Sequence, residues 1–183
     1  MAVYSSQVPL GAPLPAQTLP DLNGQPHFLP DLRGEGVLVV VFSANHCPYV
    51  RHVEDALGAL AAEYRGHGAA FVAIGSNDVV AYPDDDLPGL AAQAARASWD
   101  FPYLVDREQT VARDFGAVCT PDFFAYDVNG ELGYRGAFDA SSPGNGLPAT
   151  GDLLRAAIDL LIATEPVPEP QRPAMGCSIK WRT

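Results

Sequence analysis

Residues 37–50 read Val-Leu-Val-Val-Val-Phe-Ser-Ala-Asn-His-Cys-Pro-Tyr-Val and join an apolar run to the start of a helical pattern. The apolar run contains three consecutive valines, which favours a central β-strand covered on both faces. Over residues 48–65, apolar residues recur at steps of three and four, which predicts an amphipathic helix. Pro48 fits the first helical position, where the N–H group that proline lacks is not needed. The sequence therefore places Cys47 at a strand-to-helix junction.

A thiol at the start of a helix lies in an environment that favours its reactive form. It faces the positive end of the helix dipole and backbone N–H groups without helical partners, and both stabilise a thiolate. Arg51, one turn further on, would add positive potential, and His46 would do the same or transfer a proton. The simpler alternatives are that Cys47 only packs in the core and that His46 only caps or packs.

The remaining chain predicts an α/β domain. A second buried strand at residues 69–74 completes a strand–helix–strand unit, for which a right-handed crossover is expected. Asn23-Gly24 is a hairpin turn signal between two short extended segments. The further elements that we expect are helices at 87–98, 109–115 and 151–163 and strands at 103–105, 122–127 and 132–135.

Composition and charge argue against several classes of protein. The 183-residue chain has a net charge of −11, which argues against binding to nucleic acid or an anionic membrane by charge. It has no apolar stretch near the roughly 20 residues of a membrane span, and residues 1–6 lack the basic and apolar regions of a signal peptide. Three cysteines are too few for a disulfide scaffold, so we expect a cytoplasmic protein whose thiols are buried, metal-bound or catalytic.

Neither a metal site nor a cofactor is expected. His46, Cys47 and His52 lack the spacing of a helical chelate. The run 84–86 consists of three aspartates, and we expect a solvated loop that caps the following helix rather than a cation site. Asn77-Asp78 follows a strand end on the side of Cys47, where a substrate contact is conceivable.

The expected organisation is an N-terminal segment at 1–11, one domain at 12–163 and a proline-rich tail at 164–183. The prolines between residues 165 and 173 favour extended polyproline II structure. The apolar–polar alternation over residues 178–181 predicts that the tail ends as a short strand docked on the domain. In polyproline II the segment 163–177 spans up to about 43 Å, enough to return along a domain of this size.

Six motifs follow one another in the order of a known family. The order of elements, with a cysteine at the start of the first long helix, resembles the thioredoxin fold, and residues 12–34 resemble the N-terminal extension of redoxins and peroxiredoxins. The motifs are Asn45-His-Cys-Pro-Tyr-Val50, Ser76-Asn-Asp-Val79, Cys119-Thr-Pro-Asp-Phe-Phe124, Tyr134-Arg-Gly136, Pro143-Gly-Asn-Gly146 and Gly176-Cys-Ser-Ile-Lys-Trp181. Together they resemble a peroxiredoxin-like, AhpC/TSA-related branch of the thioredoxin-like superfamily.

This resemblance covers the chain from about residue 12 to the C-terminus and implies both a fold and a site. The fold would be a central mixed β-sheet flanked by helices, with an N-terminal β-hairpin extension and an extended C-terminal tail. Cys47 would be the nucleophile, and Pro121 would follow a cis peptide bond. The backbone beside Thr120 and Pro121 would pair with an extended substrate.

Val50 stands where a dithiol enzyme carries its second cysteine, so another thiol must complete the cycle. The candidates are Cys119, Cys177 and an external thiol such as glutathione or a reductase. Cys119 lies beside Pro121 and so is expected near Cys47, but a buried structural cysteine is an equal alternative. Cys177 is distant in sequence, and anchoring the tail is its alternative role.

Three functions fit these residues. The first is a thiol-dependent oxidoreductase that uses Cys47 on a protein or small-molecule disulfide or oxidised thiol. The second is a peroxidase, although Ala44 and Val40 replace the hydroxyl residue and the proline that peroxiredoxins usually carry three and seven residues before the cysteine. The third is a non-enzymatic scaffold that binds an extended partner beside Pro121.

Overall fold

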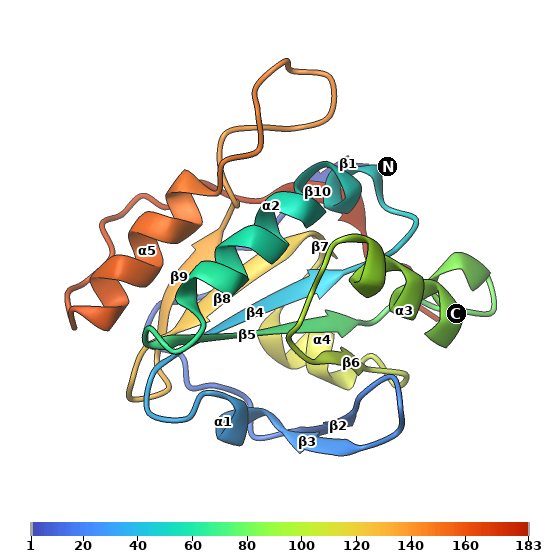
Figure 1. Ribbon diagram of the computed structural model, residues 1–183, viewed down its shortest axis with the longest axis horizontal. Coiled ribbons are helices and arrows are strands. Elements are labelled where there is room, and N and C mark those ends of the chain that lie inside the picture. The colour runs from blue at the N-terminus through green and yellow to red at the C-terminus, as the bar shows by residue number, and fades with distance from the viewer. Residues whose placement is uncertain (1, 183) are drawn as a thin grey trace.

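The computed structural model describes residues 2–182 and has a five-stranded mixed sheet at its centre (Figure 1). The strand order is β6-β5-β4-β8-β9. The first three strands are parallel to one another, and β8 and β9 run antiparallel to their neighbours. The strands are β4 (Val37–Ser43), β5 (Ala69–Gly75), β6 (Tyr103–Val105), β8 (Asp122–Tyr126) and β9 (Leu132–Gly136). The predicted central strand is therefore β4, in the middle of the sheet.

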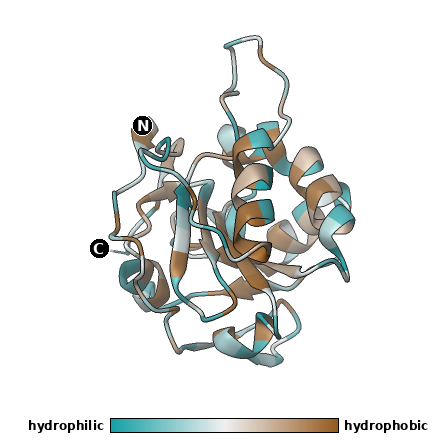
Figure 2. Cartoon of the chain, turned by 90° about the vertical axis from the view of Figure 1, so that its left-hand side faces the viewer, coloured by the Kyte–Doolittle hydropathy of each residue, from teal (hydrophilic) through white to brown (hydrophobic). Residues whose placement is uncertain are grey.

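Helices cover both faces of this sheet. The helices are α1 (Leu29–Leu32), α2 (Pro48–Tyr64), α3 (Leu87–Arg96), α4 (Thr110–Phe115) and α5 (Asp152–Ile162), and a 3₁₀ turn, η1, spans Pro83–Asp85. Residues of α2, α3 and α5 pack into the core on one face, and residues of α1 and α4 pack into the core on the other. Figure 2 shows how apolar and polar residues alternate around the helices, as expected for helices with one buried side.

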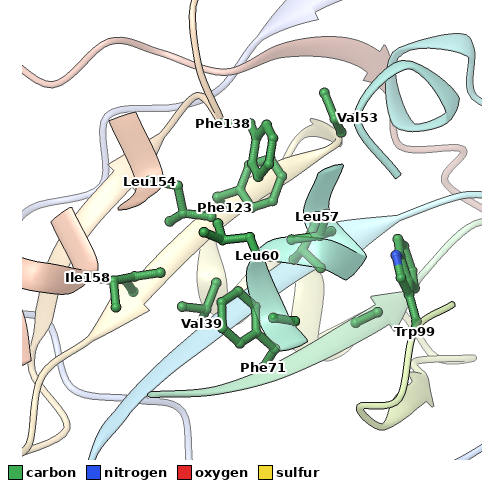
Figure 3. Close-up of a cluster of buried hydrophobic side chains, with 14 of the residues drawn as sticks. Val39, Val53, Leu57, Leu60, Phe71, Trp99, Phe123, Phe138, Leu154 and Ile158 are labelled. Carbon is green, nitrogen blue, oxygen red and sulfur yellow. The ribbon is translucent and has the colours of Figure 1, made fainter. Parts of the chain in front are cut away.

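The larger core lies between α2, α5 and the sheet. Figure 3 shows Leu57 and Leu60 of α2 and Leu154 and Ile158 of α5 facing residues of the sheet such as Val39. A fully buried side chain of this kind contributes about 1.5–3 kcal/mol of hydrophobic stabilisation. This packing fixes α2 against β4 and thereby fixes the position of the first residue of the helix.

The N-terminal hairpin is present at the predicted turn. It consists of β2 (Thr18–Pro20) and β3 (Pro26–Phe28), which pair antiparallel across Asn23-Gly24. Gly24 has a φ of +83°, a conformation that glycine adopts without strain. An isolated bridge from Asp21 to Leu104 places the hairpin beside β6.

A second, three-stranded sheet brings both ends of the chain to the start of α2. Its order is β1-β10-β7, with β1 at Ala2–Tyr4, β10 at Met175–Ser178 and β7 at Cys119–Thr120. Both pairings are antiparallel. In Figure 1, β10 and β1 lie beside the first turn of α2. The tail thus docks as a short strand at residues 175–178, earlier in the chain than the predicted 178–181, and Ile179 is buried directly after it.

Candidate active site

Cys47 occupies the N-cap position of α2 and is completely buried. The backbone of Cys47 is extended, and Pro48 starts the helix as predicted. The thiol makes no capping bond to its own helix and instead donates to the carbonyl oxygen of Thr120 at 3.1 Å. In this reduced state the sulfur therefore lies at the positive end of a 17-residue helix.

Thr120 and Pro121 form the opposite wall of the site. The peptide bond between them is cis, and Thr120 belongs to the two-residue strand β7. The backbone of Thr120 lies next to the start of α2, because its carbonyl oxygen accepts the Cys47 thiol. The hydroxyl of Thr120 is buried without a hydrogen-bond partner among the described residues.

Cys177 lies on β10, directly opposite Thr120 in the antiparallel register. It packs against the core cluster that contains Cys47, and the Cys47 thiol is close enough to contribute to the pKa of Cys177. Burial raises the pKa of Cys177 to about 11, and the contact with Cys47 adds to this shift. No disulfide joins any of the three cysteines in this structure. The tail therefore brings a second thiol to Cys47 that is distant in sequence.

Cys119 has a different environment. It pairs with Ser178, one register position from the Cys177–Thr120 pair, and successive residues of a strand point to opposite faces. It is fully buried and donates a weak hydrogen bond to the Pro121 carbonyl at 3.7 Å. Burial raises the pKa of Cys119 far above its usual value. Cys119 is thus close to Pro121 and, by this register, on the opposite face of the paired strands from Cys177, although the charges of Cys47 and Cys177 also add to the rise of its pKa.

His46 is held by a buried carboxylate. Its Nδ1 lies 2.6 Å from Oδ2 of Asp85, and its backbone N–H donates to the other carboxylate oxygen at 3.2 Å. The His46 ring also stacks on Tyr82, with 5.3 Å between ring centroids. Burial alone would raise the pKa of Asp85, but hydrogen bonds from His46 and Asn77 outweigh burial and lower it. Asp85 is therefore an ionised acceptor that orients His46.

This arrangement corrects the prediction of a solvated loop at 84–86. Asp85 is only 4% exposed and belongs to the site, because η1 turns its side chain inward. Asp86 caps α3 as predicted, since its carboxylate accepts the N–H of Gly89 at 2.8 Å. The sequence shows three identical side chains in a row and does not indicate which of them faces the interior.

Arg51 has a structural contact at the edge of the site. Its Nε donates to the backbone carbonyl of Asn45 at 2.8 Å, and the residue is otherwise exposed. The carboxamide of Asn45 in turn donates to the Asp84 carbonyl and accepts from Arg96. These bonds fix the turn between β4 and α2, which carries His46 and Cys47.

Two amide side chains, Asn77 and Gln109, clamp the tail beyond Cys177. Asn77 donates to Asp85 at 2.7 Å and accepts the backbone N–H of Lys180 at 2.8 Å. Gln109 donates to the Lys180 carbonyl at 2.8 Å and accepts the N–H of Arg182 at 2.8 Å. Asn77 therefore joins the His46–Asp85 pair to the strand that carries Cys177. Its place after a strand end was a signal in the sequence, whereas nothing pointed to Gln109.

Next to the first turn of α2 is a small, partly open pocket. It is lined by residues of the first turns of α2, of the loop after β9 and of the tail, among them Tyr49, His52, Pro121, Arg172 and Met175. Among residues 2–182, no three His, Cys, Asp or Glu side chains gather as a possible metal site. Over the same residues, no helix is both long and apolar enough to cross a membrane.

The fold and the thiol site are those of a thioredoxin-like redox domain. The model of the AhpC/TSA family matches residues 10–135, which is more than half of the chain, and the chain belongs to this family. Among curated proteins it is similar to the thiol-disulfide oxidoreductase ResA of Geobacillus kaustophilus (strain HTA426). The two are 28% identical over 127 residues, which cover 68% of this chain and 67% of the relative.

Solved structures show the same fold over the whole chain. An uncharacterised conserved protein from Geobacillus kaustophilus is 43% identical, with a TM-score of 0.95 and coverage of 100% of this chain and 97% of that one. A hypothetical protein from Sinorhizobium meliloti 1021 is 41% identical, with a TM-score of 0.95 and 98% coverage of both chains. A secreted Mycobacterium tuberculosis disulfide oxidoreductase homologous to E. coli DsbE shares the fold at 20% identity, a TM-score of 0.61 and coverage of 80% and 96%.

Proposed function

We propose that this chain is a thiol-disulfide oxidoreductase in which Cys47 is the nucleophile and Cys177 is the resolving thiol. The observation that carries the proposal is the position of the Cys177 thiol beside the Cys47 thiol, on a strand paired with Thr120. The relatives named as thiol-disulfide oxidoreductases support the class of reaction.

The pair supplies both steps that a dithiol site requires. The Cys47 thiolate attacks a substrate disulfide, forms a mixed disulfide with one half and releases the other half as a thiolate. Cys177, after loss of its proton, then attacks the sulfur of Cys47 and releases the second half. The product is a Cys47–Cys177 disulfide, and two equivalents of an external thiol return both cysteines to the reduced state.

Cys177 is better placed than Cys119 for the second step. Cys177 faces Cys47, whereas Cys119 bonds to Pro121 on the other face of its strand. Val50, at the usual position of the second cysteine, is 1% exposed and packs in the core. The tail thus replaces the missing cysteine of the motif with a residue from the opposite end of the chain.

His46 is a candidate for the proton transfer that the first step needs. When its Nδ1 donates to the Asp85 carboxylate, its Nε2 is left as a proton acceptor. The thiol of Cys47 must give up its proton before it attacks, because only the thiolate is the nucleophile. Asp85 and Tyr82 hold the ring in one orientation and so support this role.

The test compares three single variants with the wild type: Cys47→Ser, Cys177→Ser and, as the matched control, Cys119→Ser. Each is given a model disulfide and hydrogen peroxide, with dithiothreitol as the reductant. We expect Cys47→Ser to lose disulfide turnover, Cys177→Ser to stop at a mixed disulfide on Cys47, and Cys119→Ser to turn over normally. Full turnover by Cys177→Ser would contradict the resolving role.

The same assay separates the competing functions. Turnover of the disulfide that exceeds consumption of peroxide supports the proposal. Fast turnover of peroxide with slow disulfide exchange would instead identify a thiol peroxidase, which membership of the AhpC/TSA family makes the second candidate. A Cys47 thiol that is inert to both reagents would leave the function of a binding scaffold.

A further inference from the structure

We infer that, in the oxidised form of the proposed enzyme, the reducing thiol attacks the sulfur of Cys177 and releases Cys47. The mixed disulfide with the reductant then forms on strand β10 and not at the start of α2. The inference rests on the proposed function, because it presupposes a disulfide between Cys47 and Cys177. Cys177 would then be the residue that the reducing thiol attacks first when the enzyme is reduced.

The first support is the difference in access between the two sulfurs. Cys47 is 0% exposed, and its side chain belongs to the core cluster with Val50 and Val53. An external thiol that attacks Cys47 must therefore reach a sulfur that has no exposed surface. Cys177 is only partly buried and packs against the core cluster that contains Cys47. An attacker of Cys177 therefore approaches from outside the core.

The second support is the covered edge of β7. An extended partner that approaches Cys47 along β7 would need the backbone groups of Cys119 and Thr120. In this structure β10 occupies that edge, with Cys177 opposite Thr120. β1 pairs with the other edge of β10, and Asn77 and Gln109 hold the chain on the far side of Cys177. Cys177 thus occupies the position opposite Thr120 that a cysteine of an extended substrate peptide would occupy if it paired with β7.

The third support is the difference between the two leaving groups. Exchange is faster when the sulfur that leaves is stable as a thiolate. The sulfur of Cys47 lies at the start of the 17-residue helix α2, where the helix dipole favours negative charge. The sulfur of Cys177 has no helix end beside it, and its pKa is raised to about 11. Release of Cys47 is therefore the favoured direction.

The fourth support is the positive charge of Lys180, which is held on the same segment of the tail as Cys177. The charge of Lys180 opposes the rise in the pKa of Cys177, so its ammonium group lies within electrostatic range of that thiol. The ammonium group is held by the Ser178 carbonyl at 2.6 Å and lies 5.4 Å from the centre of the Tyr82 ring. An anionic attacker is attracted to this position.

The steps balance with two equivalents of thiolate, RS⁻. The first equivalent forms a bond to the sulfur of Cys177, breaks the Cys47–Cys177 bond and releases Cys47 as a thiolate. The second attacks the RS sulfur of the mixed disulfide, forms RSSR and releases Cys177 as a thiolate. The enzyme gains two electrons, the two thiols lose them, and the released thiolates take up protons from water.

The test follows the reduction of the oxidised wild-type protein by glutathione as the probe thiol. Samples are quenched with acid at early times, alkylated, digested and analysed by mass spectrometry. We expect glutathione on the peptide that contains Cys177 in at least tenfold excess over the peptide that contains Cys47. Glutathione found mainly on Cys47 would overturn the inference. If oxidation yields no Cys47–Cys177 disulfide, it is the proposed resolving role that fails, and this is seen before glutathione is added.

A second measurement does not depend on the rapid exchange between the two cysteines. Two double variants are used, and each keeps one site cysteine. Cys119→Ser/Cys47→Ser keeps Cys177, and Cys119→Ser/Cys177→Ser keeps Cys47. The remaining cysteine is loaded with thionitrobenzoate as a mixed disulfide. Glutathione that attacks the protein sulfur releases the coloured anion, and we expect at least tenfold faster release from Cys177 than from Cys47. Equal or inverted rates would contradict the inference. With Lys180→Met, release from Cys177 should slow at low salt, whereas Arg65→Met should leave it unchanged.

Discussion

The thiol of Cys47 donates to a backbone carbonyl and leaves the N–H groups of its own helix without a side-chain acceptor. The site can therefore stabilise the negative charge that forms when Cys47 loses its proton. Loss of the proton removes the bond to Thr120 and leaves an anion at the positive end of α2. His46, oriented by Asp85, is the base that we propose for this proton. At the scale of single residues, the chemistry depends on these few contacts.

Asp122 is a second buried carboxyl group, and it lies directly after Pro121. It is 0% exposed, and neither of its oxygens makes a well-formed hydrogen bond to the described residues. Burial raises the pKa of Asp122 well above its usual value, and the nearby N–H groups of Val118 and Phe123 oppose this only in part. The folded protein therefore keeps a proton on Asp122 that the unfolded chain releases near pH 4.

We predict that Asp122→Asn stabilises the protein at neutral pH. The raised pKa means that the free energy of unfolding of the wild type falls as the pH rises above about 4. The amide removes this loss, so the variant should be more stable than the wild type at pH 7. Near pH 3 the two proteins should be equally stable.

Urea unfolding between pH 3 and pH 8 measures this difference. Asp55→Asn, at an exposed position of α2, is the matched control, and because it retains Asp122 its stability should follow that of the wild type across this pH range. If Asp122→Asn is less stable than the wild type at pH 7, the folded protein stabilises the charged carboxylate of Asp122, and the prediction is wrong.

At the scale of elements, the site is a meeting of one helix and two short strands. α2 supplies Cys47, β7 supplies the carbonyl that binds it, and β10 supplies Cys177. The pairing of β10 with β7 depends on Gly176. A Cβ atom there would lie 2.0 Å from the carbonyl oxygen of Thr120 and 2.5 Å from its carbonyl carbon. Only a residue without a side chain lets the strands approach so closely.

We predict that Gly176→Ala separates β10 from β7. The added methyl group would meet backbone atoms, which cannot turn away as a side chain can. The variant should keep its main sheet, because that sheet is built from other strands. It should form the Cys47–Cys177 disulfide at least tenfold more slowly on mild oxidation. Mass spectrometry of the oxidised peptides and circular dichroism check the two statements.

Ser178→Ala serves as the control for this change, because it alters the same strand without adding an atom to the contact with Thr120. If Gly176→Ala oxidises at the rate of the wild type, the register of β10 does not position Cys177. If it loses its circular dichroism, the second sheet is needed for folding itself.

At the scale of the whole molecule, the two ends of the chain close over the start of α2. β1 comes from the N-terminus and β10 from the C-terminus, and each is paired with the other (Figure 1). A disulfide between Cys47 and Cys177 would tie the tail to the centre of the domain and enclose most of the chain in one covalent loop. The oxidation state should therefore change global stability as well as the site.

We predict that the oxidised wild type is more stable to guanidinium than the reduced wild type. Closing a loop of more than 100 residues lowers the entropy of the unfolded chain, which is worth about 4–5 kcal/mol. Unfolding curves with and without reductant measure the difference, and Cys177→Ser should show none. Equal stability of the two states of the wild type would mean that strain in the folded, oxidised form offsets the entropy.

Much of the fold could be predicted because its signals are local. The apolar run at 37–42 and the period of the helix that follows led to β4 and α2, and Asn23-Gly24 led to the N-terminal hairpin. The short strands β1 and β7 and the turn η1 were not predicted, because two or three residues carry no measurable period. These elements form through pairing or capping partners that are distant in sequence.

The part of the site that lies in one continuous motif could also be predicted from the sequence. Cys47, His46 and Pro48 stand in one motif, and the helix that follows shows where they lie. Asp85 was expected to be solvated, yet it is buried against His46, because η1 turns one of three identical side chains inward. Gln109 binds the tail from the start of α4, which no local pattern indicates.

The sequence by itself determined a helix-start thiol without a second cysteine at residue 50, since both depend only on the order of neighbouring residues. Tertiary structure alone decided which thiol meets it. Cys119 and Cys177 are both buried or partly buried cysteines near the end of a short strand, and the sequence does not rank them. The antiparallel register of β10 on β7 turns Cys177 toward Cys47 and leaves Cys119 on the other face. A shift of one residue would exchange these faces, and only long-range pairing fixes the register.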